Sequence, residues 1–140
     1  LASKPSADQL VAMRIHGASP DFVKGMRAKL GRDLSVHELV AFRIHGVSPE
    51  FVEQMHQLVS KDLTGDQLVA FRIHGVSPEF AKEMKEQGYD HISPDQLVAM
   101  RIHGVNAAFV KEVRDRGYKN PSIDELIQMR IHGLSRRAAL

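Results

Sequence analysis

One tetrapeptide, Arg-Ile-His-Gly, occurs five times in this chain of 140 residues, and each copy begins 29 residues after the one before. The copies start at Arg14, Arg43, Arg72, Arg101 and Arg130. A constant interval of about 20–50 residues indicates tandem structural repeats, each of which buries its apolar surface against its neighbours. This repeat therefore constrains the fold more strongly than the composition does.

A helix-start signal precedes every copy of the motif. It is a capping box, in which a hydroxyl side chain and a Glu or Gln three residues later satisfy two backbone N–H groups. The five pairs are Ser6 and Gln9, Ser35 and Glu38, Thr64 and Gln67, Ser93 and Gln96, and Ser122 and Glu125. The helix predicted from each box runs for about nine residues to the motif's His, and the following Gly is expected in the left-handed conformation that ends a helix. This first helix is apolar on most sides, so we predict that it is the inner helix of its repeat.

A second helix is predicted directly after the first. Its start is marked by Ser19-Pro20-Asp21 in the first repeat and by similar triplets in the second and third. Ser is a good N-cap, Pro fits the first helical position, and an acid is favourable near the helix N-terminus. One face is apolar, with Phe22, Val23 and Met26 in the first copy. Each repeat therefore predicts a hairpin of two short helices.

Because a nine-residue helix is marginal alone, the hairpins are expected to stack on one another. We predict an all-α fold, an α-solenoid of tandem two-helix repeats with a period of 29 and a TPR-like superhelix. The single domain 1–140 is divided into repeats at about 6–34, 35–63, 64–92, 93–121 and a divergent C-terminal capping repeat at 122–140. Three changes in the fifth repeat indicate the cap. Gln128 replaces an Ala, Ala138 replaces a Phe, and Arg136-Arg137 replaces the Pro-acid pair of earlier repeats.

The composition restricts the class of protein. The chain has no Cys, which excludes disulfides and thiolate ligands, and no apolar run approaches the roughly 18 residues of a membrane span. The net charge is +2, but residues 1–49 carry +3, residues 50–100 carry −5 and residues 101–140 carry +4. This pattern is not the uniform basic stripe of a nucleic-acid groove. We expect a soluble cytoplasmic or periplasmic domain without membrane contact, monomeric or weakly self-associating head to tail through its oppositely charged blocks.

The five motif histidines do not predict a metal site. Packed helices lie about 8–10 Å apart, whereas two nitrogens on one zinc ion are separated by no more than roughly 4 Å. We therefore expect no metal and no cofactor. A cation is favourable at a helix C-terminus, where a ring N–H can reach a free carbonyl, so the main expectation is that these histidines cap or pack.

The motif arginines lie near acidic residues in the sequence, such as Asp21 and Glu50 at the start of the second helix. Ion pairs between helices are the first expectation, and binding of an external anion is the second. Arg101 is expected to be the free arginine, because Ala108 replaces the acid in its repeat. A partner could contact the whole set, namely Arg14, His16, Arg43, His45, Arg72, His74, Arg101, His103, Arg130 and His132.

No catalytic constellation is present in the sequence, so we expect no enzyme. The leading prediction is a protein–protein interaction or scaffold module, read through the concave stripe of the first helices or the variable outer face of the second helices. The alternative is non-specific binding of a nucleic-acid backbone by the Arg and His ladder, which would weaken steeply with added salt.

The unit "RIHGVSPEFAKEMKEQGY" resembles a short bacterial helical repeat of the pattern R-x-H-G-V-x-P-E-F. Similar arrays form tails of membrane metallopeptidases of the β-lactam-sensor type and occur in other bacterial proteins. The resemblance implies a non-catalytic module, a regulatory appendage of a larger and membrane-anchored parent, with an unidentified partner. Repeats one, two and four depart from the pattern, since the first two lack Gly-Tyr and the fourth has "VNAAF" in place of the Pro-acid pair.

Overall fold

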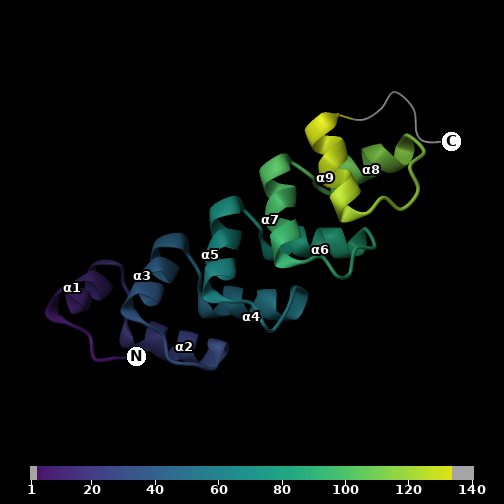
Figure 1. The fold of residues 1–140 in the computed structure, drawn as a ribbon. Helices are drawn as coiled ribbons and strands as arrows, with labels where there is room; N and C mark the ends of the chain where they lie inside the picture. The colour runs from purple at the N-terminus through teal and green to yellow at the C-terminus, as the bar shows by residue number, and fades with distance from the viewer. Residues whose placement is uncertain (1–2, 134–140) are drawn as a thin grey trace. The chain divides into compact units, whose positions relative to one another are not determined.

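The computed structural model describes residues 3–133, and within this range the chain forms nine α-helices and no strand (Figure 1). The helices are α1 (Ala7–Ile15), α2 (Pro20–Leu30), α3 (Val36–His45), α4 (Pro49–Leu58), α5 (Gly65–His74), α6 (Pro78–Glu86), α7 (Pro94–His103), α8 (Ala107–Asp115) and α9 (Ile123–His132). The all-α prediction is confirmed for the described residues. Of the predicted cap, Gln128 is exposed on α9, whereas Arg136, Arg137 and Ala138 lie outside the described range.

The helices belong to two compact parts, residues 1–73 and residues 74–140. In the first part α1 lies against α3 and α2 lies against α4. In the second part α7 lies against α9. Within each part, therefore, helices two places apart in the chain are neighbours, as Figure 1 also shows.

The predicted caps are present. All five capping boxes form, and in the first one Gln9 N donates to Ser6 Oγ at 3.2 Å while Ser6 N donates to Gln9 Oε1 at 2.8 Å. The second-helix caps of the first three repeats are Ser19, Ser48 and Ser77, each followed by Pro at the first helical position. Asn106 replaces Ser in the fourth, where its side chain accepts from Phe109 N at 2.8 Å. The short helices are thus bounded by their own local sequence.

The ends of α1, α3 and α7 also follow the prediction, whereas Gly133 after α9 has φ +83° and ψ 159° and is not in the predicted left-handed helical conformation. Gly46 has φ +75°, and Val47 N donates to Phe42 O at 2.8 Å, which is the six-to-one hydrogen bond of a Schellman motif. The same bond joins Val105 N to Met100 O at 2.8 Å. Because only Gly adopts this conformation without strain, the motif's Gly is required for the turn between the two helices.

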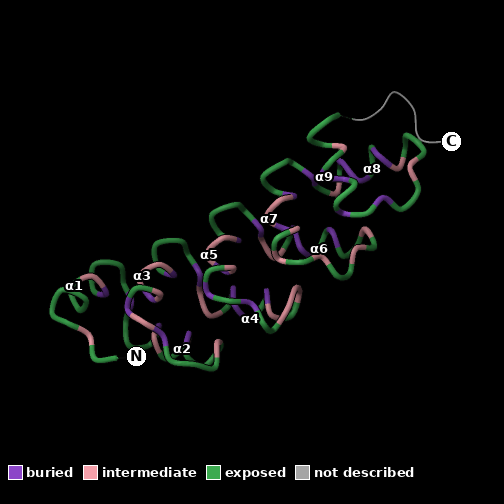
Figure 2. Tube along the Cα trace, viewed as in Figure 1, coloured by how far each residue is buried: buried purple, intermediate pink, exposed green. Residues whose placement is uncertain are grey.

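The core comes from repeated positions of both helices, whose buried segments are purple in Figure 2. The second helices contribute Phe22, Phe51, Phe80 and Phe109, none more than 8% exposed. The first helices contribute a leucine column, and Leu39, Leu68, Leu97 and Leu126 are at most 2% exposed. Burial of these columns provides the tertiary packing that helices of nine to eleven residues need.

The first helices are apolar on most sides, as expected for an inner helix, but one apolar position is exposed in every copy. The motif's isoleucines are exposed, from 47% at Ile131 to 72% at Ile15. A helical projection counts these side chains as core, but no neighbouring helix covers this face of α1, α3, α7 or α9 within its compact part.

Candidate interaction surface

The motif arginines stack on aromatic rings of the preceding repeat. The guanidinium carbon of Arg43 lies 4.9 Å from the centroid of the Phe22 ring, and that of Arg72 lies 4.4 Å from Phe51. The same contact joins Arg101 to Phe80 at 4.7 Å and Arg130 to Phe109 at 5.2 Å. A guanidinium within about 6 Å of a ring is attracted by the ring's quadrupole.

Two of these arginines also bond the backbone at the end of the preceding first helix. Arg43 Nε donates to His16 O at 3.2 Å, and Arg72 Nε donates to Gly46 O at 2.9 Å. Carbonyls at a helix C-terminus lack intrahelical partners and carry partial negative charge, so a guanidinium is a favourable donor there. Each arginine therefore fastens its own repeat to the one before it.

The motif's Gly has a second role in this contact. A Cβ added at Gly17 would lie 3.0 Å from Arg43 Nη2, and one added at Gly104 would lie 3.3 Å from Arg130 Nε. The absence of a side chain thus lets the next repeat's guanidinium lie flat over the turn. In this contact the Arg of one motif copy lies over the Gly of the preceding copy.

The expectation that these arginines form ion pairs is not met in the described residues. Arg101 was expected to be free, and this expectation is wrong because Arg101 stacks on Phe80. Within residues 3–133, the motif arginine without a partner is Arg14, since no ring or carbonyl of an earlier repeat lies beside it. Binding of a partner by the motif arginines is not tested by this geometry and stays a prediction. It concerns Arg14, Arg43, Arg72, Arg101 and Arg130.

The motif histidines lie at the solvent-exposed ends of the first helices, which are green in Figure 2. The only ring hydrogen bond of these five histidines within the described range joins His132 Nε2 to Gln128 Oε1 at 3.1 Å. This partner is a side chain, so the predicted capping of a free carbonyl by the ring N–H is wrong. Partner binding by His16, His45, His74, His103 and His132 also stays a prediction.

The isoleucines between the Arg and the His are exposed in every copy, and within each compact part they form an apolar row along the first helices. The exposed fraction is 56% at Ile44, Ile73 and Ile102; Ile15, Ile44 and Ile73 belong to residues 3–73, and Ile102 and Ile131 belong to residues 74–133. Half-buried valine and alanine side chains, such as Val40 and Ala41, lie one turn earlier on the same helices. In residues 3–73 this apolar face recurs on α1, α3 and α5, and in residues 74–133 it recurs on α7, whereas on α9 exposed Gln128 interrupts it beside Ile131.

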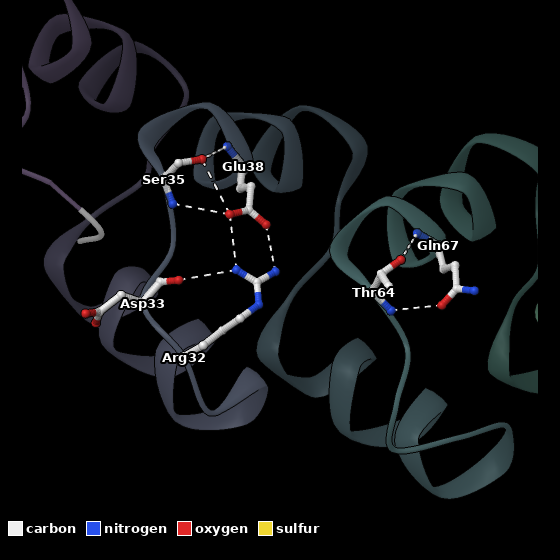
Figure 3. Close-up of polar contacts among 6 residues, drawn as sticks. All are labelled: Arg32, Asp33, Ser35, Glu38, Thr64 and Gln67. Carbon is white, nitrogen blue, oxygen red and sulfur yellow. Dashed lines mark hydrogen bonds and ion pairs between the residues drawn. The ribbon is translucent and has the colours of Figure 1, made fainter.

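The capping box of the second repeat also takes part in an ion pair (Figure 3). Arg32 Nη2 donates to Glu38 Oε2 at 2.7 Å and Arg32 Nη1 donates to Glu38 Oε1 at 3.2 Å. The hydrogen bond from Arg32 lowers the pKa of Glu38, and the same bond raises the pKa of Arg32. At the third repeat Gln67 occupies the equivalent place and makes the capping box without the ion pair.

No three His, Cys, Asp or Glu side chains of residues 3–133 are grouped as a metal ion would need. No helix of that range combines the length and hydropathy needed to cross a membrane. Comparison with protein-family models, with curated proteins and with solved structures gives no match.

Sequence reasoning missed both the arginine–phenylalanine contact and the exposed isoleucine row. A signal for the first was present, because each stacked ring precedes its arginine by 21 residues in all four pairs. The row had no such signal, since an apolar residue at a helical spacing is typical of the core.

Proposed function

We propose that this chain is a non-catalytic protein–protein interaction module, which binds a partner protein along the exposed row of isoleucines. We further propose that its repeats form an α-solenoid with a TPR-like superhelix, and that the module is a regulatory appendage of a larger bacterial protein. The observation that carries the proposal is the recurrence of a half-exposed Ile in every RIHG copy.

This recurrence is not explained by the packing of the chain. The leucine and phenylalanine columns recur because they build the core, and the arginines recur because they join adjacent repeats. The isoleucines do neither, since about half or more of each side chain is open to water. Contiguous exposed apolar side chains are typical of surfaces that bind proteins.

Burial of these isoleucines would supply part of a binding free energy. Full burial of an Ile side chain stabilises by about 1.5–3 kcal/mol, so covering the exposed half of one contributes about 1 kcal/mol. Three such residues on α1, α3 and α5 would contribute about 3 kcal/mol before other contacts. The arginines are less suited to a nucleic-acid backbone, because four of them already stack on rings.

The experiment compares two variants that add the same charge to different faces. Ile44→Asp with Ile102→Asp alters the row, and Gln54→Asp with Gln57→Asp alters the exposed outer face of α4. Each variant serves as bait in a lysate of the source organism, with and without nuclease, and bound proteins are identified by mass spectrometry.

We expect one or more proteins that wild type and the glutamine variant capture equally and the isoleucine variant does not, in both nuclease arms. Circular dichroism must show that both variants stay folded. Equal capture by the two variants would exclude the isoleucine row. Loss of all capture after nuclease would favour the nucleic-acid alternative.

A further inference from the structure

An aspartate lies in line with the exposed isoleucine on four of the five first helices. It stands seven residues before the Ile, and the four copies are Asp8, Asp66, Asp95 and Asp124. Residues seven apart lie on the same face of an α-helix, about 10.5 Å from each other along the axis. All four side chains are exposed, and none forms an ion pair within residues 3–133. The open face of these helices therefore has a carboxylate at one end and an isoleucine at the other.

The helix dipole accounts for an acid in the first turn, but not for an acid at this position. In α3 the acid stands one residue later, at Glu38, which belongs to the capping box and pairs with Arg32. His37 then takes the place in line with Ile44. In α1, α5 and α7 a Gln forms the capping box, and the Asp before it stays in line with the isoleucine. These aspartates are therefore available to a ligand that covers the isoleucines.

Three of the first helices follow one another within residues 3–73 (Figure 1). Helix α1 lies against α3. The start of α5 also meets α3, since a Cβ added at Gly65 would lie 3.1 Å from Phe42 Cζ. The axes of packed helices are about 8–10 Å apart. Ile15, Ile44 and Ile73 therefore form a row that crosses the three helices in steps of about that length.

This step length favours a helix over an extended peptide as the ligand. On a helix, residues at i, i+7 and i+14 share one face and are about 10.5 Å apart, which is close to the step between isoleucines. In an extended chain, residues on one side are about 6.5–7 Å apart, so neither one nor two such intervals match the step. Extended peptides also bind by adding to a sheet edge, and residues 3–133 contain no strand.

The aspartates define the charge of that helix. A helix is about 10–12 Å wide with its side chains, so a helix on the isoleucine row has one flank beside Asp8 and Asp66. Lysine or arginine on this flank would be attracted to the two carboxylates, whereas glutamate or a phosphate would be repelled. The other edge of the row carries the exposed motif histidines His16 and His45.

We propose that the ligand of the isoleucine row in residues 3–73 is an amphipathic α-helix, which places apolar residues at intervals of seven on Ile15, Ile44 and Ile73 and basic residues beside Asp8 and Asp66. This inference rests on the proposed function, and it adds the secondary structure and the charge of the segment that binds.

The probe is a synthetic Ala-rich peptide of about 21 residues, with Leu at every seventh position and Lys along one flank of the helix. A second peptide has Glu in place of each Lys, and a third has Pro at its centre, which breaks the helix. Each is titrated into the full chain, and binding is followed by fluorescence anisotropy and by NMR shifts of the backbone amides. We expect saturable binding of the Lys peptide with shifts on the first helices, and binding at least about threefold weaker for the other two.

Two protein variants with the same change in charge test the aspartates. Asp8→Asn with Asp66→Asn should weaken the Lys peptide by about threefold, and the difference should shrink with added salt. Glu83→Gln with Glu86→Gln is the matched control, because both residues are exposed on α6 and form no ion pair in the described residues. It should leave binding unchanged, and circular dichroism must show that both variants stay folded.

Four outcomes would overturn this inference. They are absence of binding at millimolar Lys peptide, equal binding of the Lys and Glu peptides, equal binding of the Pro peptide, and equal weakening by the two protein variants. If capture from the lysate still depends on Ile44 and Ile102, the proposed function stands and only this inference fails. If Ile44→Asp with Ile102→Asp changes neither the capture nor the binding of the Lys peptide, both fail.

Discussion

Arg14 and Arg43 are the same residue of the same motif, but their surroundings differ. Arg43 stacks on Phe22 and bonds a helix-end carbonyl, whereas Arg14 contacts neither a ring nor a carbonyl in the described residues. The leucines four residues before them differ in the same way, since Leu39 is fully buried and Leu10 is 53% exposed. The comparison shows that a position in this repeat acquires its structural role only when another repeat precedes it.

The largest expected effect is on the leucine column. Leu39→Ala removes a fully buried side chain and should lower the free energy of unfolding by about 2–5 kcal/mol. Leu10→Ala, at the open face, should lower it by less than about 1 kcal/mol. Urea denaturation followed by circular dichroism measures both. Equal losses would show that the two faces do not differ in solution.

The next effect concerns the arginines. Arg72→Ala removes the stack on Phe51 and the hydrogen bond to Gly46 O, and should cost about 1–2 kcal/mol. Arg14→Ala should stay within about 0.5 kcal/mol of wild type, as is usual for an exposed residue without contacts. The same denaturation experiment tests both variants. A cost for Arg14→Ala that matches Arg72→Ala would contradict the comparison.

A smaller effect should appear with pH at the second capping box. Glu38→Gln keeps an amide oxygen for the cap, as in Gln67, but loses the ion pair with Arg32. We expect a loss of about 0.2–1 kcal/mol at pH 7. Because the pKa of Glu38 is lowered in the folded chain, its contribution is complete above the unfolded value of about 4.3 and is lost as the pH falls through the folded pKa. Melting curves of both proteins should therefore converge in acid, and a constant difference would argue against the ion pair.

The smallest effect is expected at the ion pair between Lys29 and Glu53, which is largely exposed. Lys29→Met should lower the melting temperature slightly at low salt and not at about 1 M salt, where screening removes such pairs. Lys24→Met is the control, because Lys24 is exposed and forms no ion pair in the described residues, and it should have no effect at either salt concentration. A salt-independent loss would indicate packing by the lysine stem instead.

The parts of the fold that the sequence predicts are local or periodic. Ser35 and Glu38 are three residues apart, and Gly46 directly follows its helix, so caps and turns can be read without knowing the tertiary structure. The columns of Phe51 and Leu39 repeat at a fixed interval, and their burial follows from amphipathic spacing.

The features that the sequence did not predict depend on which helix faces pack against each other. Acids near in sequence suggested ion pairs for Arg72, but the stacking of repeats directs this side chain back onto Phe51 of the preceding repeat. Ile44 fits the apolar pattern of a core residue, and only the absence of a covering helix makes it a surface residue. Sequence spacing fixes the direction of a side chain on its helix, and it does not fix what lies opposite.

The arginine–phenylalanine contact also has a consequence for symmetry. One side of the contact contributes a cation and the other contributes a ring and a carbonyl, so the two surfaces are not alike. Two identical copies of either surface cannot satisfy each other across a two-fold axis, which excludes an isologous dimer built on this contact. An assembly that uses it must be heterologous, and it adds subunits in one direction until a surface without the complementary groups ends it.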